Sequence, residues 1–142
     1  MDTNIGKGQS TDWNRSNAPS QHDSENSHIF SVYKAPIKRV IPLKSTTLSK
    51  VHAVIISDMY KAVTSDLRAL EHKKDRQVYK QKRLDFVTFS GAFTTRSTAG
   101  LIKHSNLFCI DLDDLQDVEA AKSRVMDLLP PALMFVSPSG NG

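Results

Sequence analysis

Cysteine, long apolar runs and a secretory leader are scarce or absent in this sequence of 142 residues. The single cysteine, Cys109, cannot form a disulfide within the chain, which fits a reducing compartment. No run of about 18 apolar residues occurs, so no membrane span is expected. The first residues lack the basic-then-apolar order of a secretory signal. These absences predict a cytoplasmic protein with no membrane partner. Because Cys109 lies inside an apolar run, we expect a small buried side chain and not a reactive thiol.

The net charge of +4 conceals an uneven distribution along the chain. Residues 29–103 carry fifteen Lys or Arg against five acids, whereas residues 104–142 carry two against six. A basic middle beside an acidic end suits a protein that holds a polyanion near a metal-binding carboxylate cluster. The alternative is that the basic residues only solvate helix faces, and charge alone does not decide between the two.

The chain divides into a polar tail over 1–28 and a folded part over 29–142. The tail is rich in Ser, Asn, Asp and Gln and has almost no large apolar side chains, so it is predicted to be disordered. An alternating stretch predicts a strand over 29–33, and residues 39–43 predict an edge strand or an extended connector because they include Pro42.

Helical spacing of apolar residues runs from Leu48 to Leu70, with a possible break at Ser57-Asp58 and a cap at Thr46 or Thr47. Residues 72–83 predict a mostly exposed helix or loop, and 86–89 predict a strand.

The last third of the folded part predicts a strand, a helix and a second strand. The apolar runs over 107–110 and 133–136 are typical of strands buried on both faces. Between them, Asp117 is expected to cap a helix that Pro130-Pro131 ends. This order predicts a crossover unit and therefore an α/β or α+β fold. If its two strands are parallel, the residues that follow each strand meet at one edge of the sheet.

Asp111 and Asp113 follow the first of these runs and are the leading candidates for a metal site. Residues two apart in a strand project to the same side, so the two carboxylates would repel each other unless a cation lies between them. Mg²⁺ or Mn²⁺ prefers such oxygen ligands. The alternative is an acidic turn in which Asp114 or Asp117 only caps a helix.

Two further segments are candidates for phosphate binding. The Gly-rich turn over 137–142 could bring backbone amides and serine hydroxyls to a phosphate, or could be an ordinary tight turn. Arg96 and Ser90 could contact a phosphate or a nucleic-acid backbone, or could belong to a strand and a turn with a solvated arginine. His104 lies just before the proposed metal strand and is a further candidate. A single histidine is more often a hydrogen-bonding surface residue than a catalyst.

Four stretches together resemble the VirE N-terminal-like domain of bacterial mobile-element proteins. They read VTFSGAF at 87–93 followed by Arg96, GLIKHS at 100–105, IDLD at 110–113 and FVSPSGNG at 135–142. That domain is similar to the primase-polymerase domain of the archaeo-eukaryotic primase superfamily, so the resemblance implies a mixed sheet with flanking helices. It covers roughly residues 29–142, closely over 86–142 and loosely before.

The resemblance implies roles for matching residues. Asp111 and Asp113 match the first motif, whose acids bind the catalytic metals, Mg²⁺ or Mn²⁺. The Gly-rich turn matches the approach to the second motif, which holds the triphosphate of the incoming nucleotide, and Arg96, Ser90 and His104 match further positions of the domain. The phosphate-contacting residues would be Ser137, Ser139, Gly140 and Gly142.

The basic residue of the second motif and the acid of the third motif are not among these 142 residues. We therefore expect an incomplete domain, a fragment that is inactive alone. In the complete protein, a nucleotidyltransferase would join nucleoside triphosphates on single-stranded DNA, and a helicase-like region of the same protein is a candidate partner. The alternative is a non-catalytic DNA-binding module. In both, the nucleic-acid backbone is expected to follow a basic cluster of Lys73, Lys74, Lys80, Lys82 and Arg83.

Overall fold

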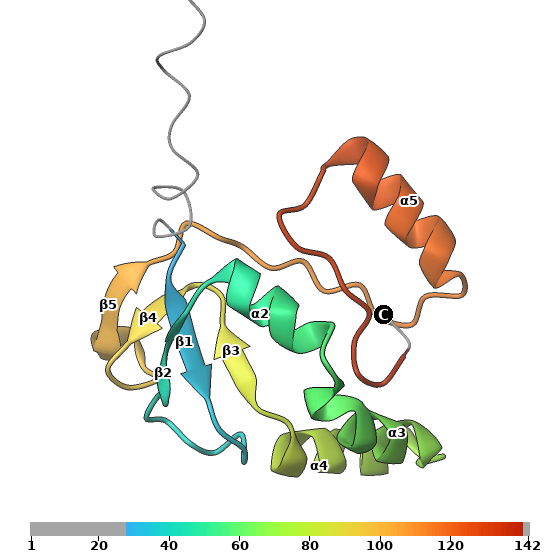
Figure 1. Ribbon diagram of the computed structural model, residues 1–142, viewed down its shortest axis with the longest axis horizontal. Helices are drawn as coiled ribbons and strands as arrows, with labels where there is room; N and C mark the ends of the chain where they lie inside the picture. The colour runs from blue at the N-terminus through green and yellow to red at the C-terminus, as the bar shows by residue number, and fades with distance from the viewer. Residues whose placement is uncertain (1–27, 141–142) are drawn as a thin grey trace, which may run out of the picture.

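The computed structural model describes residues 28–140, in which two small antiparallel sheets carry helices along one side and one end (Figure 1). Residues 1–27, which belong to the tail predicted to be disordered, lie outside the described residues. Asn141 and Gly142, the end of the Gly-rich turn, also lie outside them. The first sheet has the order β2-β1-β3, with β1 (Phe30–Tyr33), β2 (Lys44–Thr46) and β3 (Phe86–Thr88). The second sheet pairs β4 (Gly91–Phe93) with β5 (Leu101–His104). A hydrogen bond from the Phe93 amide to Ser31 Oγ (2.9 Å) joins the two sheets.

The helices follow the periodicity of the sequence closely. Helix α2 (Leu48–Ile55) is separated from α3 (Lys61–Ala69) by the short 3₁₀ helix η1 (Asp58–Tyr60), so the predicted break is confirmed. Ser57 makes this break, because its side chain accepts a hydrogen bond from the Met59 amide (3.3 Å). Thr47 occupies the cap position of α2 without a side-chain cap bond. The remaining helices are α4 (Lys73–Arg83), η2 (Thr98–Gly100) and α5 (Val118–Leu128), which Asp117 caps as predicted.

The core is small and centres on β1. Phe30, Tyr33, Leu67 and Ala92 are its buried apolar residues. The Phe30 ring lies 5.0 Å from that of Phe89, and the Tyr33 ring stacks on Phe86 at 4.9 Å. Aromatic pairs at such distances stabilise a fold beyond the area they bury, so β1 and β3 are held by their side chains as well as by their ladder.

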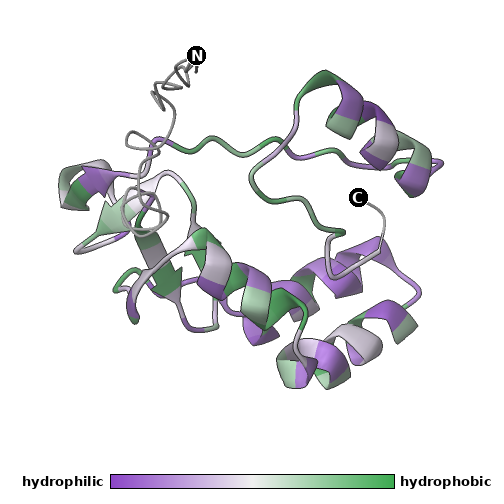
Figure 2. Ribbon diagram, turned by 45° about the horizontal axis from the view of Figure 1, so that its top comes forward, coloured by the Kyte–Doolittle hydropathy of each residue, from purple (hydrophilic) through white to green (hydrophobic). Residues whose placement is uncertain are grey.

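The two strands predicted over 107–110 and 133–136 are not formed, and the predicted crossover unit was wrong. Both segments are chain without regular secondary structure and belong to neither sheet. Phe108, Cys109 and Ile110 are exposed, so the prediction of a buried Cys109 was also wrong. Left-handed backbone at Asn106 (φ 59°) and Asp114 (φ 53°) bounds the first segment and turns it away from β5. Figure 2 shows these extended segments as apolar chain on either side of α5.

The α+β class is confirmed, with every strand pairing antiparallel. Residues 39–43 form a connector and not an edge strand. None of the helices within residues 28–140 has the length and apolar character needed to cross a bilayer.

Asp85, just before β3, joins three separate parts of the fold. It accepts hydrogen bonds from Lys34 Nζ (2.8 Å), the Ala35 amide (2.9 Å) and the Tyr60 hydroxyl (2.5 Å). Burial alone would raise the pKa of Asp85, but these donors outweigh it and the pKa is lowered. The pKa of Tyr60 is raised, first by burial and then by its bond to Asp85 and by that carboxylate's charge.

Replacing Asp85 by asparagine is expected to lower the free energy of unfolding by about 1–3 kcal/mol at neutral pH, since charge-assisted hydrogen bonds to a part-buried group are lost. A carboxyl whose pKa is lowered on folding stabilises the protein above its unfolded pKa, about 3.9, and ceases to do so as pH falls through the folded value. The difference between wild type and Asp85→Asn should therefore shrink below about pH 4. Urea unfolding followed by circular dichroism measures it. Asp58→Asn, at an exposed aspartate paired only with Lys61, is the matched control and should change little.

Candidate nucleic-acid and metal site

Helix α4 is the most basic element of the protein. Its eleven residues carry six Lys or Arg and one acid, Asp75, and none of them is buried. Two contacts fix the helix on α3 and the preceding turn. Arg76 donates from Nη1 to the carbonyls of Leu70 (2.8 Å) and Glu71 (3.1 Å), and the Tyr79 hydroxyl donates to Asp66 (3.1 Å). With the helix held in this way, Lys73, Lys74 and Lys82 are exposed to solvent and Lys80 is half-buried.

The acidic stretch, residues 111–114, contacts Lys73, the first residue of this helix. Lys73 Nζ lies 3.2 and 3.3 Å from the two carboxylate oxygens of Asp114. Asp111 and Asp113 are exposed and lie on extended chain, since no sheet forms there. Lys73 and Asp114 are themselves largely exposed, so their ion pair orients the stretch more than it stabilises the fold.

The predicted Gly-rich turn is present over the described residues 137–140. The Gly140 amide donates to the Ser137 carbonyl (2.9 Å), and the Ser137 and Ser139 hydroxyls lie 3.0 Å apart. Gly140 adopts φ +88°, a conformation that side chains disfavour, so this glycine is required by the turn. Arg68 of α3 donates from Nε to the Pro138 carbonyl (3.1 Å) and holds the turn against the helix.

Both predicted motifs therefore reach the α3–α4 pair, one at Arg68 and the other at Lys73. They do not form a complete metal site. Within residues 28–140, no three His, Cys, Asp or Glu side chains gather closely enough to hold one ion. The oxygen donors of Asp111 and Asp113 suit Mg²⁺ or Mn²⁺, whereas their number is too small for a closed coordination shell. Such a pair can hold a hydrated divalent ion only weakly.

Arg96 lies elsewhere and braces the connector between β1 and β2. Its guanidinium lies 4.9 Å from the centre of the Phe86 ring and 5.9 Å from that of Tyr33. Its Nη2 donates to the Ile37 carbonyl (2.6 Å), and its amide donates to the Val40 carbonyl (2.7 Å). None of the hydrogen bonds among the described residues joins Arg96 to the Gly-rich turn. Its contacts are those of a residue that organises the fold.

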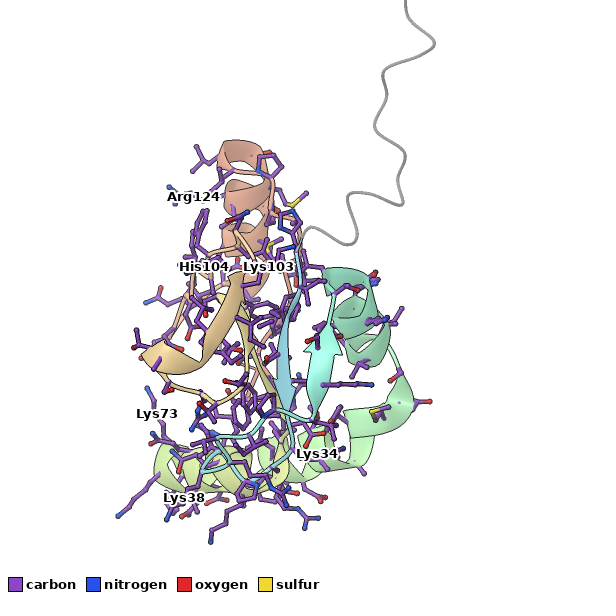
Figure 3. The ribbon with its side chains drawn as sticks, turned by 90° about the vertical axis from the view of Figure 1, so that its left-hand side faces the viewer. Lys34, Lys38, Lys73, Lys103, His104 and Arg124 are labelled. Carbon is purple, nitrogen blue, oxygen red and sulfur yellow. The ribbon has the colours of Figure 1, made fainter. Side chains whose placement is uncertain are left out.

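Ser90 and His104 meet at the end of the second sheet. The Ser90 carbonyl accepts from His104 Nδ1 (3.3 Å) and from the Ser105 amide (3.0 Å). His104 is exposed on β5 beside Lys103, as Figure 3 shows. Neither residue contacts the acidic stretch through a hydrogen bond in the described part of the chain. Ser90 contributes its backbone carbonyl here, and its contact with a phosphate stays a prediction.

Two features were missed by the sequence analysis. Ser105 is fully buried and links three segments: its hydroxyl donates to the Phe89 carbonyl and accepts from the Leu107 amide (3.1 Å), while its carbonyl accepts from His28 Nδ1 (2.6 Å). Ser105 ends the stretch GLIKHS at 100–105, but nothing in that stretch predicts its burial. The second is the set of basic residues in the connector, Lys38 and Arg39, which lie beside α4. Their signal was the run KAPIKRVIPLK at 34–44, in which four basic residues occur with no acid.

Comparison with known proteins gives one match. The family model described as BT4734-like, N-terminal domain, matches residues 79–142, somewhat less than half of the chain. That family is related to VirE-like domains, so the predicted resemblance is supported at this level. The matched part begins within α4 and includes β3, the second sheet, α5 and both predicted motifs. No curated protein and no solved structure matches the chain.

Proposed function

We propose that this chain is the nucleic-acid-binding N-terminal part of a metal-dependent, primase-polymerase-like nucleotidyltransferase that acts on single-stranded DNA in mobile-element replication or transfer. The observation that carries the proposal is the Lys73–Asp114 contact. It sets the acidic stretch at the beginning of a helix with six basic residues and one acid. A strand bound along α4 would thus lie beside the carboxylates that are proposed to hold the metal.

The assigned roles follow from the chemistry of the side chains. The lysines of α4 would neutralise backbone phosphates, and Asp111 and Asp113 would be ligands of Mg²⁺ or Mn²⁺. Ser137, Ser139 and the backbone of the Gly-rich turn would contact the phosphates of a nucleoside triphosphate. A bound ion would supply charge stabilisation at the transferring phosphoryl group. Two carboxylates are too few for two-metal catalysis, so these 142 residues are expected to be inactive alone.

A second candidate function is a non-catalytic DNA-binding module beside a helicase-like region. The observation in its favour is that Asp111 and Asp113 project from extended chain and do not meet a third acidic or histidine ligand within residues 28–140. In that case α4 would bind DNA, and the acidic stretch would only orient Lys73.

The double substitution Asp111→Ala, Asp113→Ala distinguishes the two functions. Wild-type protein should bind Mn²⁺ weakly, and the double variant should lose at least about tenfold in affinity, as both oxygen ligands are removed. Electron paramagnetic resonance of free Mn²⁺ measures this directly. A protein that carries this sequence with further residues after Gly142 should make dinucleotides or extend a primer with Mn²⁺, and the variant should not.

The matched control is Asp127→Asn on α5, an aspartate outside the acidic stretch. DNA binding is expected to persist in the double variant, because α4 is unchanged. Equal Mn²⁺ affinity or equal activity in the double variant and wild type would refute the metal assignment and leave the DNA-binding module.

A further inference from the structure

The connector, residues 34–43 between β1 and β2, combines positive charge with exposed apolar side chains. It contains Lys34, Lys38 and Arg39 and no acid, and Lys44 follows as the first residue of β2. An open groove of about 460 Å³ is lined by residues 34, 38–43. Its apolar side chains are unusually exposed for their type, from 47% at Val40 to 62% at Ile41. The groove therefore offers apolar surface between basic side chains.

This groove is held in shape from both sides. The Leu43 amide donates to the Val32 carbonyl (2.7 Å) and continues the pairing of β1 with β2. Arg96 binds the carbonyls of Ile37 and Val40 from the other side, while its guanidinium rests on the Phe86 ring. A segment fixed in this way loses little conformational entropy when a ligand binds to it.

The connector is joined directly to the C-terminal end of α4. The Ile37 amide donates to the Gln81 carbonyl at 2.8 Å. Lys38 and Arg39 come directly after Ile37 in the sequence, and Lys82 and Arg83 come directly after Gln81. This hydrogen bond therefore brings the two basic pairs to the same region of the molecule. Among the described residues, none of these four cations has an acidic partner within ion-pair distance. Figures 1 and 3 show the connector and α4 at the same end of the molecule.

We propose that the connector groove is a second binding site for the nucleic-acid strand, continuous with α4, in which Lys38 and Arg39 contact phosphates and the aliphatic side chains contact sugars and bases. This inference rests on the proposed function, since it requires that α4 bind single-stranded DNA. Helix α4 is about 16 Å long, so a bound strand would pass only a few phosphates along it before it reaches the groove. The strand leaves the acidic stretch at Lys73, follows α4 and enters the groove at Lys38.

The continuity with α4 favours a nucleic acid over an anionic lipid surface. A helix that lies on a membrane presents an apolar face along its length. In α4, Val78 is the one large apolar residue that is exposed, and the other exposed residues are polar or charged. Positive charges that continue from a polar helix into a fixed groove match a linear polyanion.

The test is the double substitution Lys38→Gln, Arg39→Gln in the 142-residue chain. Fluorescence anisotropy with a labelled oligothymidylate of about twelve nucleotides should show a loss of about 10- to 30-fold at 0.1 M salt, because two phosphate contacts disappear. The slope of log affinity against log salt should fall by about 1.4. A dinucleotide, too short to occupy α4 and the groove together, should lose much less.

The matched control is Lys122→Gln, Arg124→Gln on α5, which removes the same charge from a helix far from the connector (Figures 1 and 3). It should change affinity by less than about twofold, since no phosphate contact is lost. Equal losses in both double variants would overturn the groove assignment and indicate a general charge effect. Unchanged DNA affinity in Lys38→Gln, Arg39→Gln, together with loss of binding to phosphatidylserine vesicles, would assign the groove to lipid. Absence of DNA binding by wild type would instead refute the proposed function itself.

Discussion

Replacing Lys74, Lys82 and Arg83 of α4 by glutamine is expected to weaken binding of single-stranded DNA on the order of a hundredfold at 0.1 M salt. Each phosphate contact on a single strand contributes about 0.7 to the slope of log affinity against log salt. Three contacts therefore raise the affinity at 0.1 M salt about a hundredfold above the affinity at 1 M salt. These residues are exposed and have no acidic partner among the described residues, so their charge is available to a ligand. Glutamine keeps a good helix propensity, and α4 should remain folded.

Anisotropy titrations at several salt concentrations measure both the affinity and the slope. The control removes three positive charges elsewhere, by Lys50→Gln, Lys122→Gln and Arg124→Gln on α2 and α5. If the control variant lost as much affinity as the α4 variant, net charge and not the basic helix would account for binding. Circular dichroism should show the same helix content in both variants.

The largest loss of stability is expected from Phe30→Ala. Phe30 is fully buried on the central strand β1, and its ring packs on Phe89 at 5.0 Å. Removing a buried phenylalanine ring costs about 3–5 kcal/mol, through lost transfer free energy and the cavity left behind. A small domain has about 5–15 kcal/mol of stability in total. We therefore expect Phe30→Ala to be largely unfolded near 37 °C, as measured by thermal unfolding.

Phe108→Ala makes the same chemical change at a site that is 78% exposed, and it is the matched control. It should alter the free energy of unfolding by less than about 0.5 kcal/mol. A large effect at Phe108 would mean that the apolar segment after Ser105 packs in solution, in contrast to its extended position here. A small effect at Phe30 would contradict a core centred on β1.

The helices could be predicted from the sequence because their signals are local. Ser57 and Asp117 place polar side chains at helix starts, and each accepts a backbone hydrogen bond within three residues. The spacing of apolar residues in α2 and α3 adds a period that belongs to one element. Each of these signals can be read without knowing what the helix packs against.

The strands over 107–110 and 133–136 could not be settled in that way, since a strand exists only with a partner. An apolar run indicates that a segment favours burial, but it does not indicate which strand of a sheet the segment pairs with. Asn106 and Asp114, on either side of the first run, have left-handed backbone, which Asn and Asp adopt more readily than most residues, but residue type alone does not show which of the many Asn and Asp will do so. Arg96 illustrates the same limit at the candidate site, because its stacking on Phe86 joins segments ten residues apart and its bond to Ile37 joins segments 59 apart.

The loose attachment of α5 has a consequence for how unfolding is measured. Helix α5 has no buried residue, and it makes none of the larger contacts between elements of the described chain. We therefore expect residues 107–140 to open at a lower free energy than the unit built on β1. The free energy of unfolding that Asp85→Asn and Phe30→Ala change is therefore that of the unit built on β1. Ellipticity, which includes α5, should report an earlier and broader transition than a probe placed beside Phe30.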